Sequence, residues 1–159
     1  MAFKIFFALR SALSALRGFE KERRKIMAIE NVILTLGGEA AADLSAAQFK
    51  CVVLSSTNTW DLPKTAVTAK AIGILQNAPK LGEECVVAII GISKAWAATA
   101  LANGASVAPE WVSDADSGKV ITAATTQYPL GIVVFPSGAE DDLCSVFLNP
   151  MHKVLTEDI

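Results

Sequence analysis

The sequence predicts a mainly β protein, a small barrel or sandwich of short antiparallel strands with one short helix, preceded by an amphipathic helical arm. Short apolar segments alternate with turns rich in glycine, proline, asparagine and aspartate, which is typical of all-β folds. The first 26 residues instead repeat their apolar side chains at helical spacing. With 159 residues, 52% of them hydrophobic and 19% charged, the chain has the size of one domain and is too apolar to be largely disordered.

The expected strands all follow residue 28 and are bounded by residues that favour turns. They span residues 32–36, 49–55, 71–76, 85–90, 94–98, 105–112, 119–123, 129–135 and 143–148. The breaks between them include Gly91 and the segment 58–63. One short helix is predicted over residues 40–48, because Asp43 or Ser45 can cap it and alanine favours helix.

Two of these strands, 85–90 and 130–135, do not alternate between apolar and polar residues. A strand of a small sandwich normally has one face in water, so apolar residues on both faces predict the middle of a closed barrel or a face covered by another subunit. Aromatic side chains are also favoured at the centres of interfaces. The candidate subunit-interface residues are Val86, Ile89, Val133, Phe135, Trp96 and Trp111.

A weak internal repeat connects Gly73 with Gly131, at an offset of 58 residues. In both places a strand that begins at glycine runs into a turn with proline and glycine, then an acidic pair, then another apolar strand. The acidic pairs are Glu83-Glu84 and Asp141-Asp142. The repeat predicts two copies of one supersecondary unit.

Residues 1–27 form a basic arm in front of an acidic body. Residues 1–26 hold seven basic and two acidic side chains, a net charge of +5, whereas the rest holds seven lysines and 14 acidic residues, a net charge of −7. Apolar residues at steps of three and four, with arginines on another face, predict an amphipathic helix. The candidate contact residues of this arm are Phe6, Leu9, Leu13, Leu16, Arg10 and Arg17.

Four roles are open for the arm. Its arginines and serines resemble a transit peptide, and its phenylalanines suit a helix on a membrane surface. A secretory signal peptide fits less well, because Arg10 and Arg17 interrupt the apolar stretch. The fourth role is a helix that packs on a partner protein.

Few residues could carry chemistry, and the sequence predicts no catalytic, cofactor-binding or metal-binding residue. It lacks the nucleotide-binding, zinc-protease and serine-hydrolase motifs. Cys51, Cys85 and Cys144 lie among apolar neighbours and are expected to be buried and reduced. The single histidine, His152, lies in the tail 150–159, so zinc binding or a cysteine–histidine hydrolase is not expected. The acidic body also disfavours nucleic acid.

The order of several short motifs resembles a known family. The segment ADLSAAQF (42–49) is followed by IGILQNAP (72–79), an apolar strand, GISK (91–94), and a glycine-led strand after Gly104. This pattern resembles the small capsid cement, or head decoration, proteins of tailed bacteriophages. It covers residues 29–149 and is most specific over 72–94. The arm, and the stretch 109–116 around Trp111, are not part of that pattern.

The resemblance implies a structural protein of the virion rather than an enzyme. Proteins of this family bind the outer surface of the assembled capsid, bridge subunits of the major capsid protein, and typically form trimers. On this basis the chain comprises an arm (1–27), a cement domain (28–149) and a tail (150–159). The implied partners are the major capsid protein and other copies of the chain, without cofactor, nucleic acid or membrane, and assembly occurs in the host cytoplasm. The alternative is a membrane-surface or organelle-imported β domain that uses the arm as anchor or address.

Overall fold

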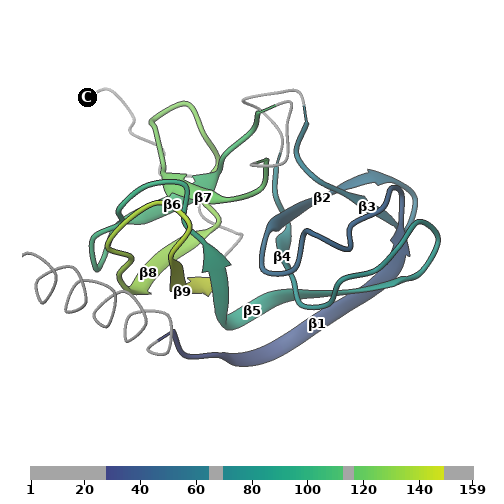
Figure 1. The fold of residues 1–159 in the computed structure, drawn as a ribbon, viewed down its shortest axis with the longest axis horizontal. Coiled ribbons are helices and arrows are strands. Elements are labelled where there is room, and N and C mark those ends of the chain that lie inside the picture. Colours follow the sequence, from purple (N-terminus) through teal and green to yellow (C-terminus); the bar gives the residue numbers. More distant parts are fainter. Residues whose placement is uncertain (1–27, 65–69, 113–116, 149–159) are drawn as a thin grey trace, which may run out of the picture.

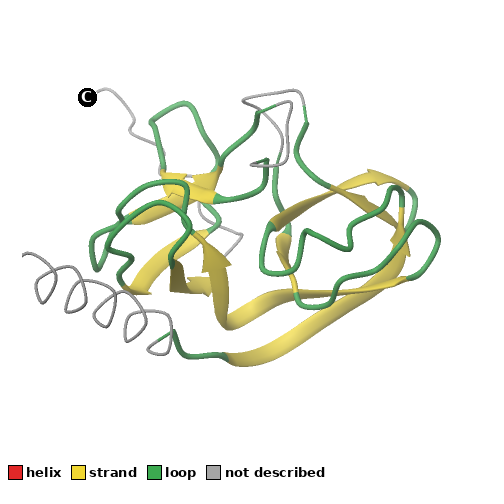
Figure 2. Cartoon of the chain, viewed as in Figure 1, coloured by secondary structure: helices red, strands yellow, loops and turns green. Residues whose placement is uncertain are grey.

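The computed structural model describes residues 28–64, 70–112 and 117–148, and these residues form nine strands. The strands are β1 (Asn31–Ala40), β2 (Cys51–Ser56), β3 (Thr59–Asp61), β4 (Gly73–Leu75), β5 (Glu84–Trp96), β6 (Ser106–Pro109), β7 (Val120–Thr122), β8 (Gly131–Phe135) and β9 (Leu143–Leu148). The described residues contain no helix (Figure 2), so the mainly β fold is confirmed. The predicted arm (1–27) and the whole tail (150–159) lie outside the described residues.

The nine strands build two small barrels that share the long strand β5. The first barrel contains β1 to β4 and the first half of β5, and β1 closes it by pairing with both β5 and β3. The second contains the rest of β5 and β6 to β9, and a parallel bridge between Ala97 and Val120 brings the end of β5 against β7. Figure 1 shows the two barrels as lobes connected through β5.

The second barrel repeats the strand pairings of the first. Antiparallel pairs β2–β3, β2–β4 and β4–β5 correspond to β6–β7, β6–β8 and β8–β9. The parallel contact of Ala40 with Trp60 corresponds to that of Ala97 with Val120. The repeat predicted from the sequence is therefore a duplicated barrel.

Gly73 and Gly131 occupy the same place in the two barrels. A Cβ atom added to Gly73 would lie 2.2 Å from the carbonyl oxygen of Ala88 on β5. A Cβ added to Gly131 would lie 2.1 Å from the carbonyl oxygen of Phe147 on β9. Real Cβ atoms do not approach backbone oxygens so closely, so each strand can pack on its neighbour only with glycine at this position.

Each barrel has its own apolar core. Eight buried residues fill the first barrel, among them Trp60, Leu75 and Val87. Thirteen buried residues form the second core, which also takes in Cys51 and Ile74 from the first set of strands. Burying a large apolar side chain contributes about 1.5–3 kcal/mol, so these clusters are the main source of stability. The second core therefore also holds the two barrels together.

Two predicted strands, 85–90 and 94–98, are one continuous strand, β5. The prediction of a break at Gly91 was wrong, because Gly91 adopts a φ of 116° and stays paired with Val32 on one side and Leu148 on the other. Glycine tolerates this backbone conformation, so it bends the strand without ending it. Strand β3 lies within the segment 58–63, which was expected to be a break.

The short helix predicted over residues 40–48 was also wrong, because this segment forms turns. The side chain of Asp43 accepts a hydrogen bond from the Ser45 backbone N–H at 3.0 Å, which closes a local turn. The Leu44 N–H donates to the carbonyl of Pro79 at 2.9 Å, and Phe49 adopts a φ of 64°. The backbone N–H groups of this segment thus form hydrogen bonds within local turns and to the loop at Pro79, instead of the regular hydrogen bonds of a helix.

Candidate assembly surface

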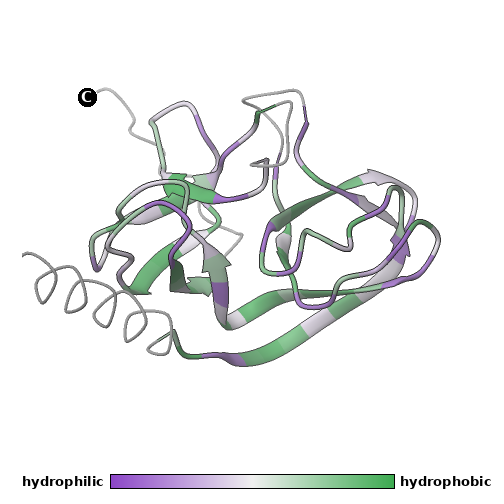
Figure 3. Cartoon of the chain, in the orientation of Figure 1, coloured by the Kyte–Doolittle hydropathy of each residue, from purple (hydrophilic) through white to green (hydrophobic). Residues whose placement is uncertain are grey.

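The first apolar surface is carried by β1 and is named the β1 patch (Ile33, Leu34, Leu36 and Val86). Ile33 is 72% exposed, and the other three side chains are between 36% and 45% exposed. Val86 on β5 is the register partner of Gly37, whereas Leu36 is the register partner of the buried Val87. Figure 3 shows apolar residues following one another along β1.

Strand β1 also has an open edge beside this patch. Within the described residues it pairs with β5 along most of its length, but with β3 only at Glu39 and Ala40. On the other side, the Gly37 carbonyl accepts a hydrogen bond from the Trp60 indole at 3.2 Å, and the backbone groups of residues 32–36 have no strand beside them in the described part of the chain. A strand edge without a neighbouring strand, combined with exposed apolar side chains, favours contact with another chain.

The second apolar surface is named the β9 face (Ile90, Ile92, Ile132 and Phe147). Ile92, Phe147 and Ile132 are register partners across β5, β9 and β8, so they form one row of side chains. Phe147 is 42% exposed and Ile132 is 47% exposed. Ile90 lies two residues before Ile92 on β5, on the other side of Gly91, and it is also exposed.

These two surfaces explain why strands 85–90 and 130–135 are apolar on both faces. In β8, Gly131 and Val133 are buried in the core, whereas Ile132 between them is exposed. In β5, Val87 is buried and Val86 is exposed. One face of each strand therefore fills a barrel, and the other is an apolar surface of the single chain.

The structure places the predicted interface residues in different environments. Val86 belongs to the β1 patch, whereas Ile89, Phe135, Trp96 and Trp111 are only partly exposed. Val133 is 1% exposed in the second core, so its predicted place at a subunit contact was wrong. It alternates with Ile132, which is the exposed residue of that strand.

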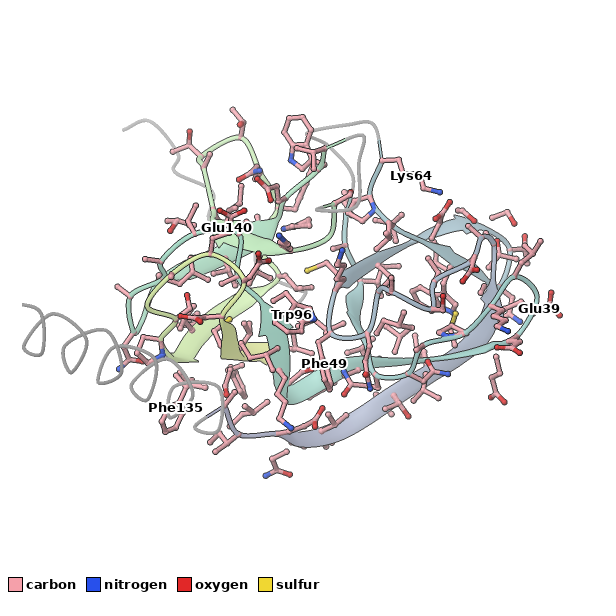
Figure 4. All side chains as sticks on the ribbon, viewed as in Figure 1. Glu39, Phe49, Lys64, Trp96, Phe135 and Glu140 are labelled. Carbon is pink, nitrogen blue, oxygen red and sulfur yellow. The ribbon has the colours of Figure 1, made fainter. Side chains whose placement is uncertain are left out.

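Trp96 packs where the two lobes meet. Its indole Nε1–H donates to the carbonyl of Gln48 at 2.9 Å, and its backbone N–H donates to the carbonyl of Phe49. Figure 4 shows Trp96 and Phe49 near one another between the lobes, whereas Phe135 lies at the outer side of its lobe. Trp96 thus connects the barrels within one chain.

The exposed residues Ile33, Leu36, Ile132 and Phe147 are not among the interface residues predicted from the sequence. Each lies in an apolar segment, and only the register of the strands decides which neighbours face the core. The arm residues Phe6, Leu9, Leu13, Leu16, Arg10 and Arg17 lie outside the described residues, as does His152.

Two acidic residues of the turn before β9, Glu140 and Asp141, lie close to a buried lysine. The Nζ of Lys119 lies 2.7 Å from a carboxylate oxygen of Asp141 and 3.9 Å from one of Glu140, although its side chain is only 6% exposed. Asp142 accepts a hydrogen bond from the Gly138 N–H at 3.2 Å. A buried ammonium needs a close carboxylate, so these residues hold the β8–β9 turn against β7.

Within residues 28–64, 70–112 and 117–148, no group of three or more His, Cys, Asp or Glu side chains is arranged to hold a metal ion. The same part of the chain has no helix long and apolar enough to cross a membrane.

The three cysteines are buried and reduced, as the sequence predicted. Burial raises the pKa of the Cys144 thiol to about 12, and it also raises the pKa of Cys51 and Cys85. The thiolate is the nucleophilic form, so these environments suppress reactivity.

We therefore expect iodoacetamide at pH 8 to alkylate all three cysteines of the native protein at least about 100-fold more slowly than in urea. Intact-protein mass spectrometry follows the labelling. Rapid alkylation of one cysteine in the folded protein would contradict this prediction and would indicate an accessible nucleophile.

Comparison with known proteins found a similar fold but no similar sequence. No protein-family model matches the sequence, and no curated protein matches it. Among solved structures, the fold resembles the N base of the head fiber gp8.5 of bacteriophage phi29. The TM-score is 0.50 at 8% sequence identity, and the match covers 74% of this chain and 94% of that one. At this identity the likeness is one of fold.

Proposed function

We propose that this chain is a structural protein of a bacteriophage virion that binds the outer surface of the capsid. The observation that carries the proposal is the fold shared with the base of a phage head fiber, over most of both chains. The order of sequence motifs, which resembles that of the cement proteins, supports the same assignment. This support is independent of the fold comparison, because it rests on the sequence alone. The exposed apolar surfaces of the single chain support a role in assembly rather than catalysis.

In this proposal the β1 patch is the main contact with the shell or with another copy. Ile33 and Leu36 are large apolar side chains on a strand with an open edge, so a partner can bury them and also pair with the backbone. Bridging neighbouring subunits of the major capsid protein then stabilises the assembled shell by mass action, because the protein binds only the assembled state. We propose a homotrimer as its form, and light scattering of the purified protein tests that state.

The arm extends this contact beyond the described residues. Arg10 and Arg17 carry positive charge, and an arm of net charge +5 can bind acidic surfaces of a neighbouring subunit. No catalytic role is part of the proposal.

The test is binding of the purified full-length chain to DNA-filled capsids of the phage that encodes it, stripped of this protein. We expect saturable co-sedimentation with a fixed number of copies per capsid, and no flotation with vesicles of anionic lipid. Flotation with vesicles combined with no capsid binding would overturn the proposal and favour the membrane-surface alternative.

A further inference from the structure

The point at which the arm joins the body is fixed by hydrogen bonds to β9. The backbone N–H of Ile29 donates to the Ser145 Oγ at 2.7 Å, and that hydroxyl donates to the Ile29 carbonyl at 2.9 Å. One residue later, Glu30 lies 3.6 Å from the Nζ of Lys94 on β5. The chain therefore crosses β9 and β5 just before β1 begins.

This crossing lies on the same side of the sheet as the β9 face. Ser145 and Phe147 are two residues apart on β9, so their side chains point to one side. Lys94 and Ile92 are their register partners on β5 and point to that side as well. A segment that ends at Ile29 consequently ends over Ser145, beside the row formed by Ile92, Phe147 and Ile132.

We propose that residues 1–27 dock on the β9 face of their own chain, with Phe6, Leu9, Leu13 and Leu16 against Ile90, Ile92, Ile132 and Phe147. The arm is long enough, because a helix of 20 residues spans about 30 Å and three strands span about 10 Å. The attachment at Ile29 keeps the arm at a high effective concentration beside this face, which favours its own chain over a second copy.

Charge supports the same arrangement. The arm carries a net charge of +5 and the rest of the chain −7, so the two parts attract one another at low ionic strength. With the apolar stripe on the sheet, Arg10 and Arg17 on the other side of the arm stay free for an acidic partner. This inference does not depend on the capsid role, because it concerns a contact within one chain.

The test is limited trypsin digestion of the full-length protein, read as the rate of cleavage after Arg10 and Arg17 by mass spectrometry. The double variant I132E/F147E places charges on the β9 face, where both side chains are already exposed. We expect it to raise the cleavage rate about tenfold, since cleavage follows the fraction of molecules with the arm released. The matched control is L54E, an exposed leucine on β2, which is expected to leave the rate unchanged.

Circular dichroism of each variant checks that the barrels remain folded. Equal cleavage rates in the wild type and I132E/F147E would overturn the proposal, because the arm would then not rest on this face. Protection that disappears on dilution would also overturn it, because the arm would then lie on a second copy. Protection that is independent of concentration and lost only in I132E/F147E supports it.

Discussion

Replacing Gly131 by alanine is expected to lower the free energy of unfolding by about 3 kcal/mol or more. The added Cβ would lie 2.1 Å from the Phe147 carbonyl oxygen and 2.9 Å from the Val146 side chain. The carbonyl cannot easily move, because Phe147 is paired with Ile132 on one side and Ile92 on the other. The β8–β9 pair would have to separate, and the second barrel would lose its closure.

The duplicated barrel predicts the same loss for the alanine variant of Gly73, whose Cβ would meet the Ala88 carbonyl oxygen at 2.2 Å. Urea unfolding followed by circular dichroism measures both variants. The matched control is Gly37→Ala, because there the nearest atom is the flexible carboxylate of Glu84 at 3.3 Å. We expect the control substitution to lower the free energy of unfolding by less than about 1 kcal/mol. Equal stability of all three variants would contradict the strand packing described above.

The double variant I33E/L36E is expected to weaken binding to capsids more than about 100-fold while the fold is retained. Both side chains are exposed in the single chain, at 72% and 42%, so charges there cost little in the free protein. When the protein binds the capsid, each of the two introduced carboxylates would have to leave water without gaining a partner, which costs several kcal/mol of binding free energy for the two together. Co-sedimentation with capsids across a range of protein concentrations measures the affinity.

The control for this experiment is again L54E, because Leu54 is 48% exposed and lies on β2, which does not pair with β1. It should bind capsids as the wild type does. Undiminished binding by I33E/L36E would show that the β1 patch is not the contact surface. Light scattering of the same variant shows whether the patch also holds copies of the chain together.

Local features of the sequence were sufficient to predict the fold class. The turn residues and apolar segments locate eight of the nine strands, and the glycines at 73 and 131 reveal the duplication. Two local sequence patterns gave wrong predictions of secondary structure. Gly91 indicates a break when considered alone, but pairing on both sides keeps β5 continuous. The alanine-rich segment 40–48 favours helix, but its backbone groups bond to a turn and to the loop at Pro79.

The candidate surface could be predicted only in part. The sequence alone shows that β5 and β8 carry apolar residues on both faces. This pattern predicts that the outer face of each strand is covered by another subunit or by another part of the chain. Which residues face outward depends on register, and a shift of one residue exchanges Val133 with Ile132. The position of the β9 face beside the crossing at Ile29 depends on hydrogen bonds between Ile29 and Ser145, which are 116 positions apart, so no local sequence pattern indicates it.

The most direct test of the proposed capsid role is cryo-electron microscopy of virions of the phage that encodes this chain. We expect density for the two barrels on the outer surface of the capsid, with the β1 patch against the major capsid protein or a second copy of the chain. Virions whose outer capsid surface carries no such density, although they contain the protein, would contradict it.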